Sequence, residues 1–350
     1  MVKTLFIYSG TDRRALEEEI KQGLSPDTSF FGFTYVRKDS RIDASYIQIN
    51  KNSYTFAGGL VRKYAWLRVL YLFFKFRKEL LAADVIVLMS SAYFELMYLK
   101  RFKLLSRRRW IILNLDLSTA FQPIAKAADR IICISKAQTE DLLKRGFHPE
   151  RTIFIPLGVD KNFYKPVNSS REFILTIGRD VGRDFKTFLE AVKLSEEKTV
   201  MICSPKNVEG LEDMIPANLT ILFDLPYQEL KKYYQKAKVF VIATKPGNHF
   251  GSDCPGQTVI LDTLAYNIPV VATYMPWFEG YFENGRHLIT VPAGDPEALR
   301  KAMKEVASDR KLREVLSREG RKLVEERCNS EAMGNEIAEL ILKEEEKNWK

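Results

Sequence analysis

Cysteine and histidine are scarce in this chain of 350 residues, and their scarcity excludes several kinds of site. The four cysteines are too far apart for a zinc site or a disulfide framework, and they fit a reducing compartment: Cys133, Cys203, Cys254 and Cys328. The three histidines are His148, His249 and His287. No Asp-x-Asp pair is present to hold a metal ion. We therefore expect no bound metal and no cofactor.

Long hydrophobic runs are also missing. No apolar run reaches the roughly 18 residues that a membrane-spanning helix needs. The first apolar run, of about five residues, is too short for the core of a signal peptide. With 46% hydrophobic and 28% charged residues, the composition is that of a soluble globular protein. The length favours two domains, and we expect a cytoplasmic protein.

The net charge of +9 is concentrated in one segment. Residues 51–110 contain 13 Lys and Arg but 3 Asp and Glu, and large apolar side chains lie between the cations. Such a segment suits an anionic membrane surface, which would place the protein peripherally on the inner face of the cell membrane. A half-buried helix with a solvated basic edge also explains the pattern. Nucleic acid is disfavoured, because no binding module of the usual kinds is recognisable.

Short apolar runs alternate with helical patterns along the whole chain, which is typical of doubly wound α/β domains. In the first half we expect strands at residues 4–8, 30–36, 45–50, 84–88 and 110–115, a strand and then a loop within 128–136, and helices at 60–81 and 137–145. In the second half we expect strands at residues 173–177, 199–203, 219–223, 239–244, 268–272 and 287–291. Residues 166–170 have the composition of a linker. The predicted domains are therefore 1–165 and 171–329, followed by a helix at 330–350.

Ligands of doubly wound sheets bind beyond the carboxyl ends of the strands. Ser9, Gly10 and Thr11 follow the first strand and are candidates to line a cleft. Asp116 follows the strand at 110–115. It is a candidate catalytic group, although a cap for the next helix explains it at least as well.

The second half carries residues that suit an anionic ligand. Arg179 and Arg183 follow a strand and Gly178, and their guanidinium groups can grip a diphosphate, with Lys186 as a further cation. A solvated basic loop is the alternative. Gly256 lets the backbone approach a ligand closely at the start of a helix.

The first amides of that helix, at Gln257 and Thr258, would point toward an anion. An ordinary helix connection explains the same sequence about as well. His249 lies in the polar loop before this helix and is a further candidate for the cleft, although an exposed loop histidine is more often incidental.

Two segments carry a family resemblance: GQTVILDTLAYNIPVVAT, and ADRIICISKAQTEDLLKRGFHPERTIFIPLGVDKNFYKP before it. They resemble the retaining glycosyltransferases of GT-B architecture, glycosyltransferase family 4 (group 1). The resemblance implies two Rossmann-like domains facing a central cleft, with a C-terminal helix that crosses back to the first domain. It also implies metal-independent transfer of a sugar from a nucleotide-diphosphate-sugar to a saccharide or lipid-linked acceptor, with retention of configuration.

The resemblance assigns roles to individual residues. Asp262 would hold the ribose hydroxyls, and Leu225 would meet the nucleotide base through its backbone. The diphosphate would lie against the amides after Gly256 and against Arg179 and Arg183, and Arg183 would also act in catalysis by stabilising the leaving group. Lys186 is a less favoured candidate than Arg183 for the family's basic residue that holds the diphosphate.

Two positions depart from the family pattern. Cys254 stands where the family has a glutamate, with Asp253 beside it as a donor-binding candidate. The family's first-domain histidine has no counterpart, so Asp116 is the candidate to replace it. These departures leave two alternatives open: a nucleotide-sugar epimerase of the same fold, and a degenerate GT-B protein that acts as a membrane-associated scaffold.

Overall fold

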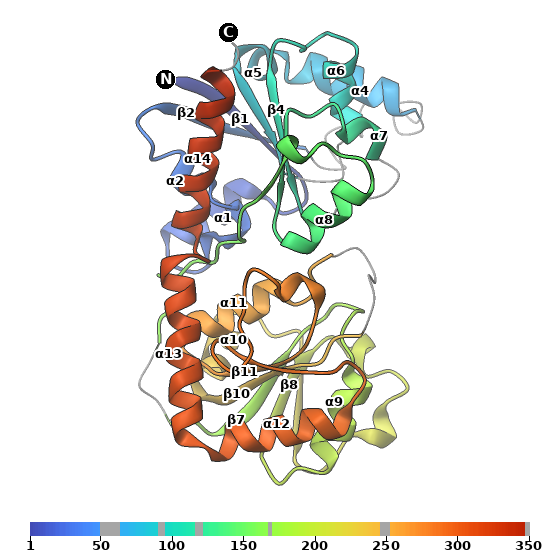
Figure 1. The fold of residues 1–350 in the computed structure, drawn as a ribbon, viewed down its shortest axis with the longest axis vertical. Helices are drawn as coiled ribbons and strands as arrows, with labels where there is room; N and C mark the ends of the chain where they lie inside the picture. The colour runs from blue at the N-terminus through green and yellow to red at the C-terminus, as the bar shows by residue number, and fades with distance from the viewer. Residues whose placement is uncertain (50–63, 90–94, 116–121, 167–169, 246–252, 347–350) are drawn as a thin grey trace. The chain divides into compact units, whose positions relative to one another are not determined.

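The computed structural model describes residues 1–49, 64–89, 95–115, 122–166, 170–245 and 253–346. The chain divides into two units, each built around a sheet of six parallel strands (Figure 1). Unit 1 comprises Met1–Lys21, Ser29–Pro156 and Ser330–Lys350, and unit 2 comprises Gln22–Thr28 and Leu157–Asn329. The predicted class, two doubly wound Rossmann-like folds in one chain, is confirmed.

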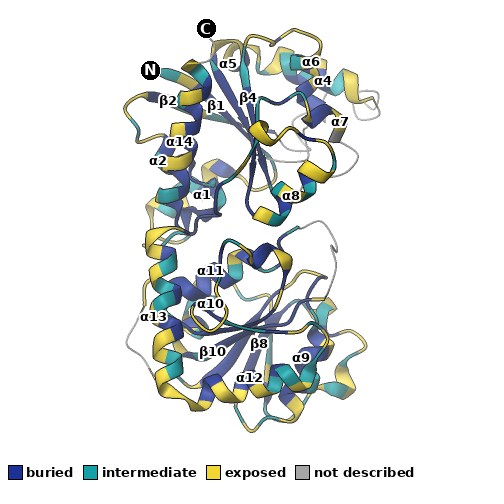
Figure 2. Cartoon of the chain, in the orientation of Figure 1, coloured by how far each residue is buried: buried dark blue, intermediate teal, exposed yellow. Residues whose placement is uncertain are grey.

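The sheet of unit 1 has the order β2-β1-β3-β4-β5-β6. Its strands are β1 (Val2–Tyr8), β2 (Ile42–Gln48), β3 (Val85–Leu88), β4 (Arg109–Asn114), β5 (Arg130–Cys133) and β6 (Thr152–Phe154). The central strands β3 and β4 are buried along nearly their whole length, because helices cover both faces (Figure 2). The strand order reverses between β1 and β3, so the loop after β1 lies at the switch point of this sheet.

The helices of unit 1 are α1 (Arg13–Lys21), α2 (Phe33–Val36), α4 (Ala65–Lys75), α5 (Arg77–Ala82), α6 (Met97–Arg101), α7 (Gln122–Ala125), α8 (Lys136–Lys144) and α14 (Ser330–Glu346), with a 3-10 turn at Pro149–Arg151. A further 3-10 turn, Asp27–Phe30, begins in the unit 2 segment and ends in unit 1. The helix expected at 60–81 is two helices within the described residues, and the break falls at Phe76, whose φ is −112°. None of the helices in the described ranges is both long and apolar enough to cross a bilayer.

The strand expected at residues 30–36 is wrong. These residues form the end of a 3-10 turn and α2, because their aromatic side chains pack into a cluster against the sheet rather than alternating across it. The ring of Phe30 lies 5.8 Å from that of Tyr8, and the ring of Phe33 lies 5.5 Å from that of Tyr46. Gly32, with φ +80°, makes the turn that separates the two elements.

The C-terminal helix α14 belongs to unit 1 and packs on α2, as expected for a helix that returns to the first domain. The contact is made by two glycines. A Cβ on Gly334 would lie 2.5 Å from the carbonyl oxygen of Gly32, and a Cβ on Gly32 would lie 2.7 Å from Gly334 Cα. The two backbones therefore touch, and neither position has room for a side chain.

We expect Gly334→Ala to destabilise the protein by about 1–3 kcal/mol, because the added methyl group overpacks this contact. Alanine in a helix is otherwise favoured over glycine by about 1 kcal/mol, so a net loss measures the clash. The exposed neighbour on the same turn supplies the control, Asn335→Ala. Urea denaturation gives both free energies of unfolding. If Gly334→Ala is as stable as the control, the close packing of α14 on α2 is wrong.

The sheet of unit 2 has the order β12-β11-β10-β7-β8-β9. Its strands are β7 (Phe173–Ile177), β8 (Thr199–Cys203), β9 (Leu219–Phe223), β10 (Ala237–Ile242), β11 (Val270–Thr273) and β12 (Ile289–Val291). The helices are α9 (Phe185–Lys193), α10 (Tyr227–Lys236), α11 (Gln257–Ala265), α12 (Pro296–Ser308) and α13 (Arg310–Glu326), and short 3-10 turns occur at Pro205–Asn207, Glu212–Met214 and Pro276–Phe278. The order reverses between β7 and β10, which sets the switch point of this sheet.

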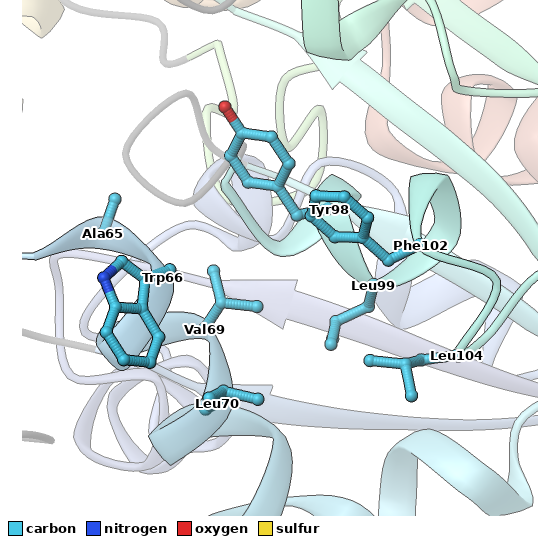
Figure 3. Close-up of a pocket in the computed structure, with 8 residues that line it drawn as sticks. All are labelled: Ala65, Trp66, Val69, Leu70, Tyr98, Leu99, Phe102 and Leu104. Carbon is cyan, nitrogen blue, oxygen red and sulfur yellow. The ribbon is translucent and has the colours of Figure 1, made fainter.

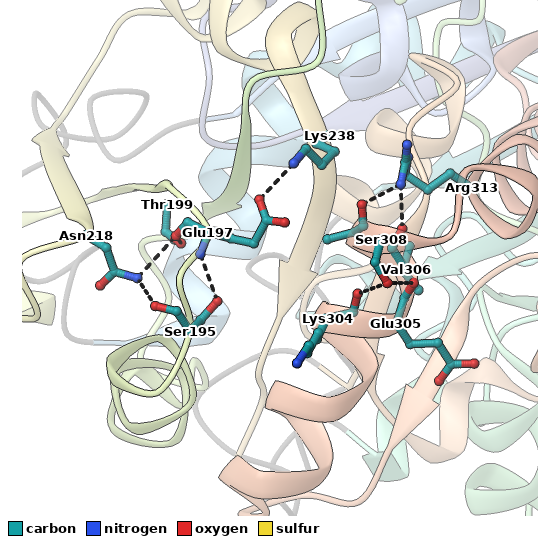
Figure 4. A network of polar contacts seen from close by, with 11 residues as sticks. Ser195, Glu197, Thr199, Asn218, Lys238, Lys304, Glu305, Val306, Ser308 and Arg313 are labelled. Atoms are coloured by element: carbon teal, nitrogen blue, oxygen red, sulfur yellow. Dashed lines mark hydrogen bonds and ion pairs between the residues drawn. The ribbon is translucent and has the colours of Figure 1, made fainter.

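Hydrogen bonds and an ion pair connect the segments at the amino-terminal ends of the strands of this sheet (Figure 4). The Asn218 side chain, just before β9, donates to the carbonyl oxygens of Ser195 (2.7 Å) and Glu197 (3.2 Å). Lys238, in β10, forms a 2.8 Å ion pair with Glu197. Arg313 donates to the carbonyl oxygen of Val306 at the end of α12. The connections at this edge thus satisfy their own polar groups, whereas buried polar groups without partners occur at the carboxyl edge.

Candidate active site

The loop after β7 is held against the end of β10 at the switch point of unit 2. Arg183 pairs with Thr244 as an isolated antiparallel bridge, and Asp184 N–H donates to the carbonyl oxygen of Ala243 (3.0 Å). The Asp184 carboxylate then accepts from Thr187 N–H (3.1 Å) and caps α9. These hydrogen bonds hold the backbone of the loop in one conformation, so the Arg183 side chain has a defined position.

Arg183 is buried between two glycines. A Cβ on Gly178 would lie 3.0 Å from Arg183 Cγ and would collide with Nε, and a Cβ on Gly256 would lie 2.8 Å from Nη1 and would collide with Ile242. The residue is 5% exposed. The guanidinium group therefore packs closely against both glycines, and the φ of +79° at Gly256 is a further reason for glycine there.

The guanidinium group is incompletely paired. Asp180 Oδ2 lies 2.9 Å from Nε as an ion-pair partner, but neither Nε nor Nη1 has a well-oriented hydrogen bond among the described residues. Burial lowers the pKa of Arg183, and Asp180 raises it. A buried cation with unused N–H groups is costly, and an anion bound beside Nη1 would offset that cost.

Helix α11 begins beside Arg183. Gly256 is its N-cap with φ +79°, and no side chain caps the first turn. Gln257 N–H donates to the carbonyl oxygen of Cys254 (3.2 Å). Contrary to the prediction, this amide is therefore not open to a ligand. The N–H groups of Thr258 and Val259 have no partner among the described residues, and the helix dipole makes this end positive. Two backbone donors and one guanidinium group thus lie at the same corner of the sheet.

Arg179 reaches the turn after β9. Its Nη2 donates to the carbonyl oxygen of Leu225 (3.2 Å), and its Nε lies 3.4 Å from Asp224 Oδ1. The structure therefore brings together two residues predicted to hold different parts of a nucleotide. Lys186 is exposed on the first turn of α9 and forms no hydrogen bond or ion pair with another described residue. Asp253 is half-buried before α11, next to the buried Cys254.

Asp262 has surroundings that the sequence did not indicate. It is 4% exposed on α11, where Oδ2 accepts from the Tyr227 hydroxyl (3.4 Å) and Oδ1 has no partner among the described residues. The Tyr164 hydroxyl contacts that of Tyr227. Burial raises the pKa of Asp262 to about 8, although the two tyrosines lower it. Burial thus favours the protonated form of Asp262. Sequence spacing gave no signal for Tyr164 or Tyr227.

The candidates of the first half lie in unit 1 or outside the described residues. Ser9, Gly10 and Thr11 follow β1 at the switch point, where the Gln48 side chain donates to the carbonyl oxygens of Gly10 (3.2 Å) and Thr11 (2.6 Å). Asp116, like His249 of the second half, lies outside the described ranges. Within the described ranges, no three His, Cys, Asp or Glu side chains are grouped to hold a metal ion.

One further side chain of unit 1 was missed by the sequence argument. Arg13, the first residue of α1, is 6% exposed and stacks its guanidinium group 4.7 Å from the ring of Tyr8. Its Nε and Nη1 have no hydrogen-bond partner among the described residues. Arg13 lies two residues beyond Thr11, the last of the loop candidates.

Comparisons with known proteins agree with this architecture. Residues 160–323 match the family described as glycosyl transferases group 1, so unit 2 carries the pattern of that family. No curated protein sequence matches the chain.

Solved structures match over nearly the whole chain. HepE of Anabaena in complex with UDP and glucose is 14% identical, with 98% of this chain and 100% of that chain covered and a TM-score of 0.71. Sucrose-phosphate synthase from Thermosynechococcus elongatus is 16% identical (98% and 99% covered, TM-score 0.71). A glycosyltransferase from Rickettsia africae is 14% identical (98% and 99% covered, TM-score 0.72). The fold is that of the GT-B glycosyltransferases.

Proposed function

We propose that the protein transfers a hexosyl group from a nucleotide-diphosphate-sugar to an acceptor hydroxyl, with retention of anomeric configuration. The observation that carries the proposal is the buried guanidinium group of Arg183 between Gly178 and Gly256, with Nη1 unpaired. An anion at this point would satisfy Arg183 and the free amides of α11 together. The neighbour from Anabaena is a complex with UDP and glucose, which supports a nucleoside diphosphate as that anion.

The chemistry needs stabilisation of a leaving diphosphate. The bond between the anomeric carbon and the phosphate oxygen breaks, and negative charge gathers on the diphosphate. The acceptor oxygen bonds to that carbon, and its proton passes to an oxygen of the departing diphosphate. Arg183 and the positive end of α11 would stabilise this charge without a metal ion. Leu225 would meet the base, and Asp262 would hold the ribose after the Tyr227 hydroxyl releases Oδ2. Asp116 is the proposed group near the reacting carbon.

The proposed acceptor is a saccharide, or a lipid-linked sugar at an anionic membrane surface. The basic aromatic segment 51–110 supports the second choice, and the protein would then work from the cytoplasm, peripherally on the membrane. Neither the family match nor the named neighbours favour an epimerase or a scaffold.

We expect one of UDP, GDP, ADP and dTDP to raise the melting temperature by several degrees, because a ligand at 100 times its Kd stabilises the folded state by about 2.7 kcal/mol. Arg183→Met should abolish the shift. Arg318→Ala should keep it, since that side chain is exposed on α13, away from the switch point. Differential scanning fluorimetry gives the melting temperature of each of the three proteins with each of the four nucleotides. If no nucleotide shifts the wild-type protein, or if both variants lose the shift equally, the proposal is wrong.

A further inference from the structure

Two helices of unit 1 expose large apolar side chains. Trp66 on α4 is 61% exposed, and Phe102 at the end of α6 is 68% exposed. Between the helices lies an apolar groove of about 470 Å³ (Figure 3). Its lining is Ala65, Trp66, Val69, Leu70, Tyr98, Leu99, Phe102 and Leu104. A contiguous exposed apolar patch of this kind is uncommon on a soluble protein and indicates a binding surface.

A second cavity adjoins this groove and is basic. It has a volume of about 400 Å³ and shares Leu104 with the groove, and its polar lining includes Lys103, Arg107 and Arg108. Lys103 and Arg107 are exposed and form no ion pair with a carboxylate of the described residues. Arg108 donates to the carbonyl oxygen of Leu81 and lies 3.6 Å from an Asp84 oxygen. Two cations of this basic cavity therefore remain available to a ligand.

Three neighbouring cations are engaged in ion pairs within the unit. Arg68 forms a 3.0 Å ion pair with the buried Glu95, and Lys100 and Arg109 both pair with Asp129. Lys103 and Arg107, by contrast, form no such pair and lie beside the apolar groove. A hydrocarbon chain and an anionic group, joined in one molecule, match the two adjoining cavities.

We propose that the apolar groove and the basic cavity bind one anionic membrane lipid, with an acyl chain in the groove and the phosphate beside Lys103 and Arg107. Charge complementarity selects this occupant, because an apolar partner alone would leave the two cations unused. Single-stranded nucleic acid would also use the cations, but the sequence contains no recognisable nucleic-acid-binding module. The inference rests on the membrane-surface part of the proposed function and does not depend on the donor site.

The place of the basic cavity in the sheet separates the proposed phosphate site from the sugar chemistry. The basic cavity lies at the amino edge, because Leu81 precedes β3 and Arg108 precedes β4. The candidate loop Ser9–Thr11 lies at the carboxyl edge of the same sheet. The lipid would therefore hold unit 1 at the bilayer and would not be the acceptor itself.

Lys103 offers a clean test, because its backbone has φ +64°, in the left-handed region. It ends α6: Lys103 N–H donates to Lys100, and Leu105 N–H donates to Leu99. Glycine is the residue that usually occupies this position of a helix end. Lys103→Gly therefore removes the cation while it keeps the turn and relieves its strain.

The experiment is flotation of the full-length protein with vesicles of phosphatidylglycerol and phosphatidylcholine, or of phosphatidylcholine alone. We expect at least tenfold tighter binding to the anionic vesicles, falling with salt. Lys103→Gly should weaken it about fivefold, because one cation near the surface contributes about 1 kcal/mol. Trp66→Ser and Phe102→Ser should each weaken it at least about tenfold. Leu194→Ser, 66% exposed in unit 2, should stay within about twofold of the wild type.

Three results would overturn the proposal. Equal binding to both vesicle types would show that Lys103 and Arg107 do not recognise an anionic lipid. Unchanged binding in Trp66→Ser and Phe102→Ser would show that the groove does not bind the acyl chain. A dimer of the wild type that Phe102→Ser dissociates would make the groove an interface between copies of this chain.

Two readouts separate lipid from other ligands. Glycerol phosphate should neither bind nor compete at millimolar concentration, and competition by it would assign the basic cavity to a free phosphate. Doxyl-labelled lipid should quench the emission that Trp66→Ser removes, and unchanged emission would contradict insertion. The nucleotide-dependent melting shift should be the same in Lys103→Gly and wild type, so failure here is distinct from failure of the donor site.

Discussion

Arg183→Met is expected to lower kcat/KM for sugar transfer by about 100- to 1000-fold, the effect of removing one preorganised donor to a developing negative charge. The guanidinium group is buried, lies beside the first turn of α11 and has an unused Nη1. Methionine fills similar space between the two glycines and supplies no charge. Steady-state kinetics with the donor that the melting assay identifies would measure the change.

The same variant is expected to be as stable as the wild type or more stable. Replacing a buried, incompletely paired charge by an apolar side chain of similar volume is often neutral or stabilising. Arg171 is the control, because it is a half-buried arginine that donates to the carbonyl oxygens of Gln235, Ala237 and Asn267. Arg171→Met should lower stability, by leaving these groups unpaired, and keep kcat/KM. If Arg183→Met instead loses stability and keeps activity, Arg183 is a structural residue.

The strands of unit 2 were predictable because parallel strands covered on both faces are continuous apolar runs. The expected bounds of β7, β8 and β9 agree with the structure to the residue. A strand of this kind can be recognised from its own sequence, without knowing which helices pack on it. In unit 1 the same reasoning failed at residues 30–36, where aromatic side chains resemble a strand in sequence but pack as a cluster. The cluster depends on Tyr8, Tyr46 and Gly334, which are distant in sequence.

The candidate site was predictable to a similar extent. Gly178, Arg183 and Gly256 converge because strand order places the loops after β7 and β10 at one switch point, a property of topology that strand-loop-helix patterns indicate. The close contact of the Arg183 side chain with the two glycines could not be predicted, because no spacing in the sequence indicates it. The burial of Asp262 was not predictable for the same reason. Tyr164 and Tyr227 lie 98 and 35 residues before it, and no periodicity links them to α11.

Asp262 is expected to make stability depend on pH. Its pKa is raised by burial from an ordinary value of 3.8 to about 8. Between these values the folded protein holds a proton that the unfolded chain has released, so the free energy of unfolding falls as pH rises. The contribution is fully present below about pH 4 and is lost above about pH 8. Each pKa unit corresponds to about 1.4 kcal/mol, so the loss amounts to several kcal/mol.

Asp262→Asn isolates this effect, because asparagine has nearly the same shape and does not titrate. We expect the variant and the wild type to be about equally stable at pH 4, and the variant to be more stable by a few kcal/mol at pH 8. Urea denaturation of both proteins from pH 4 to 9 gives the difference curve, in which the other titrating groups cancel. A flat curve would mean that Asp262 is ionised in the folded state at neutral pH. In that case the Tyr227 hydroxyl would be donating to a carboxylate, and the ribose role would not require the release of a proton.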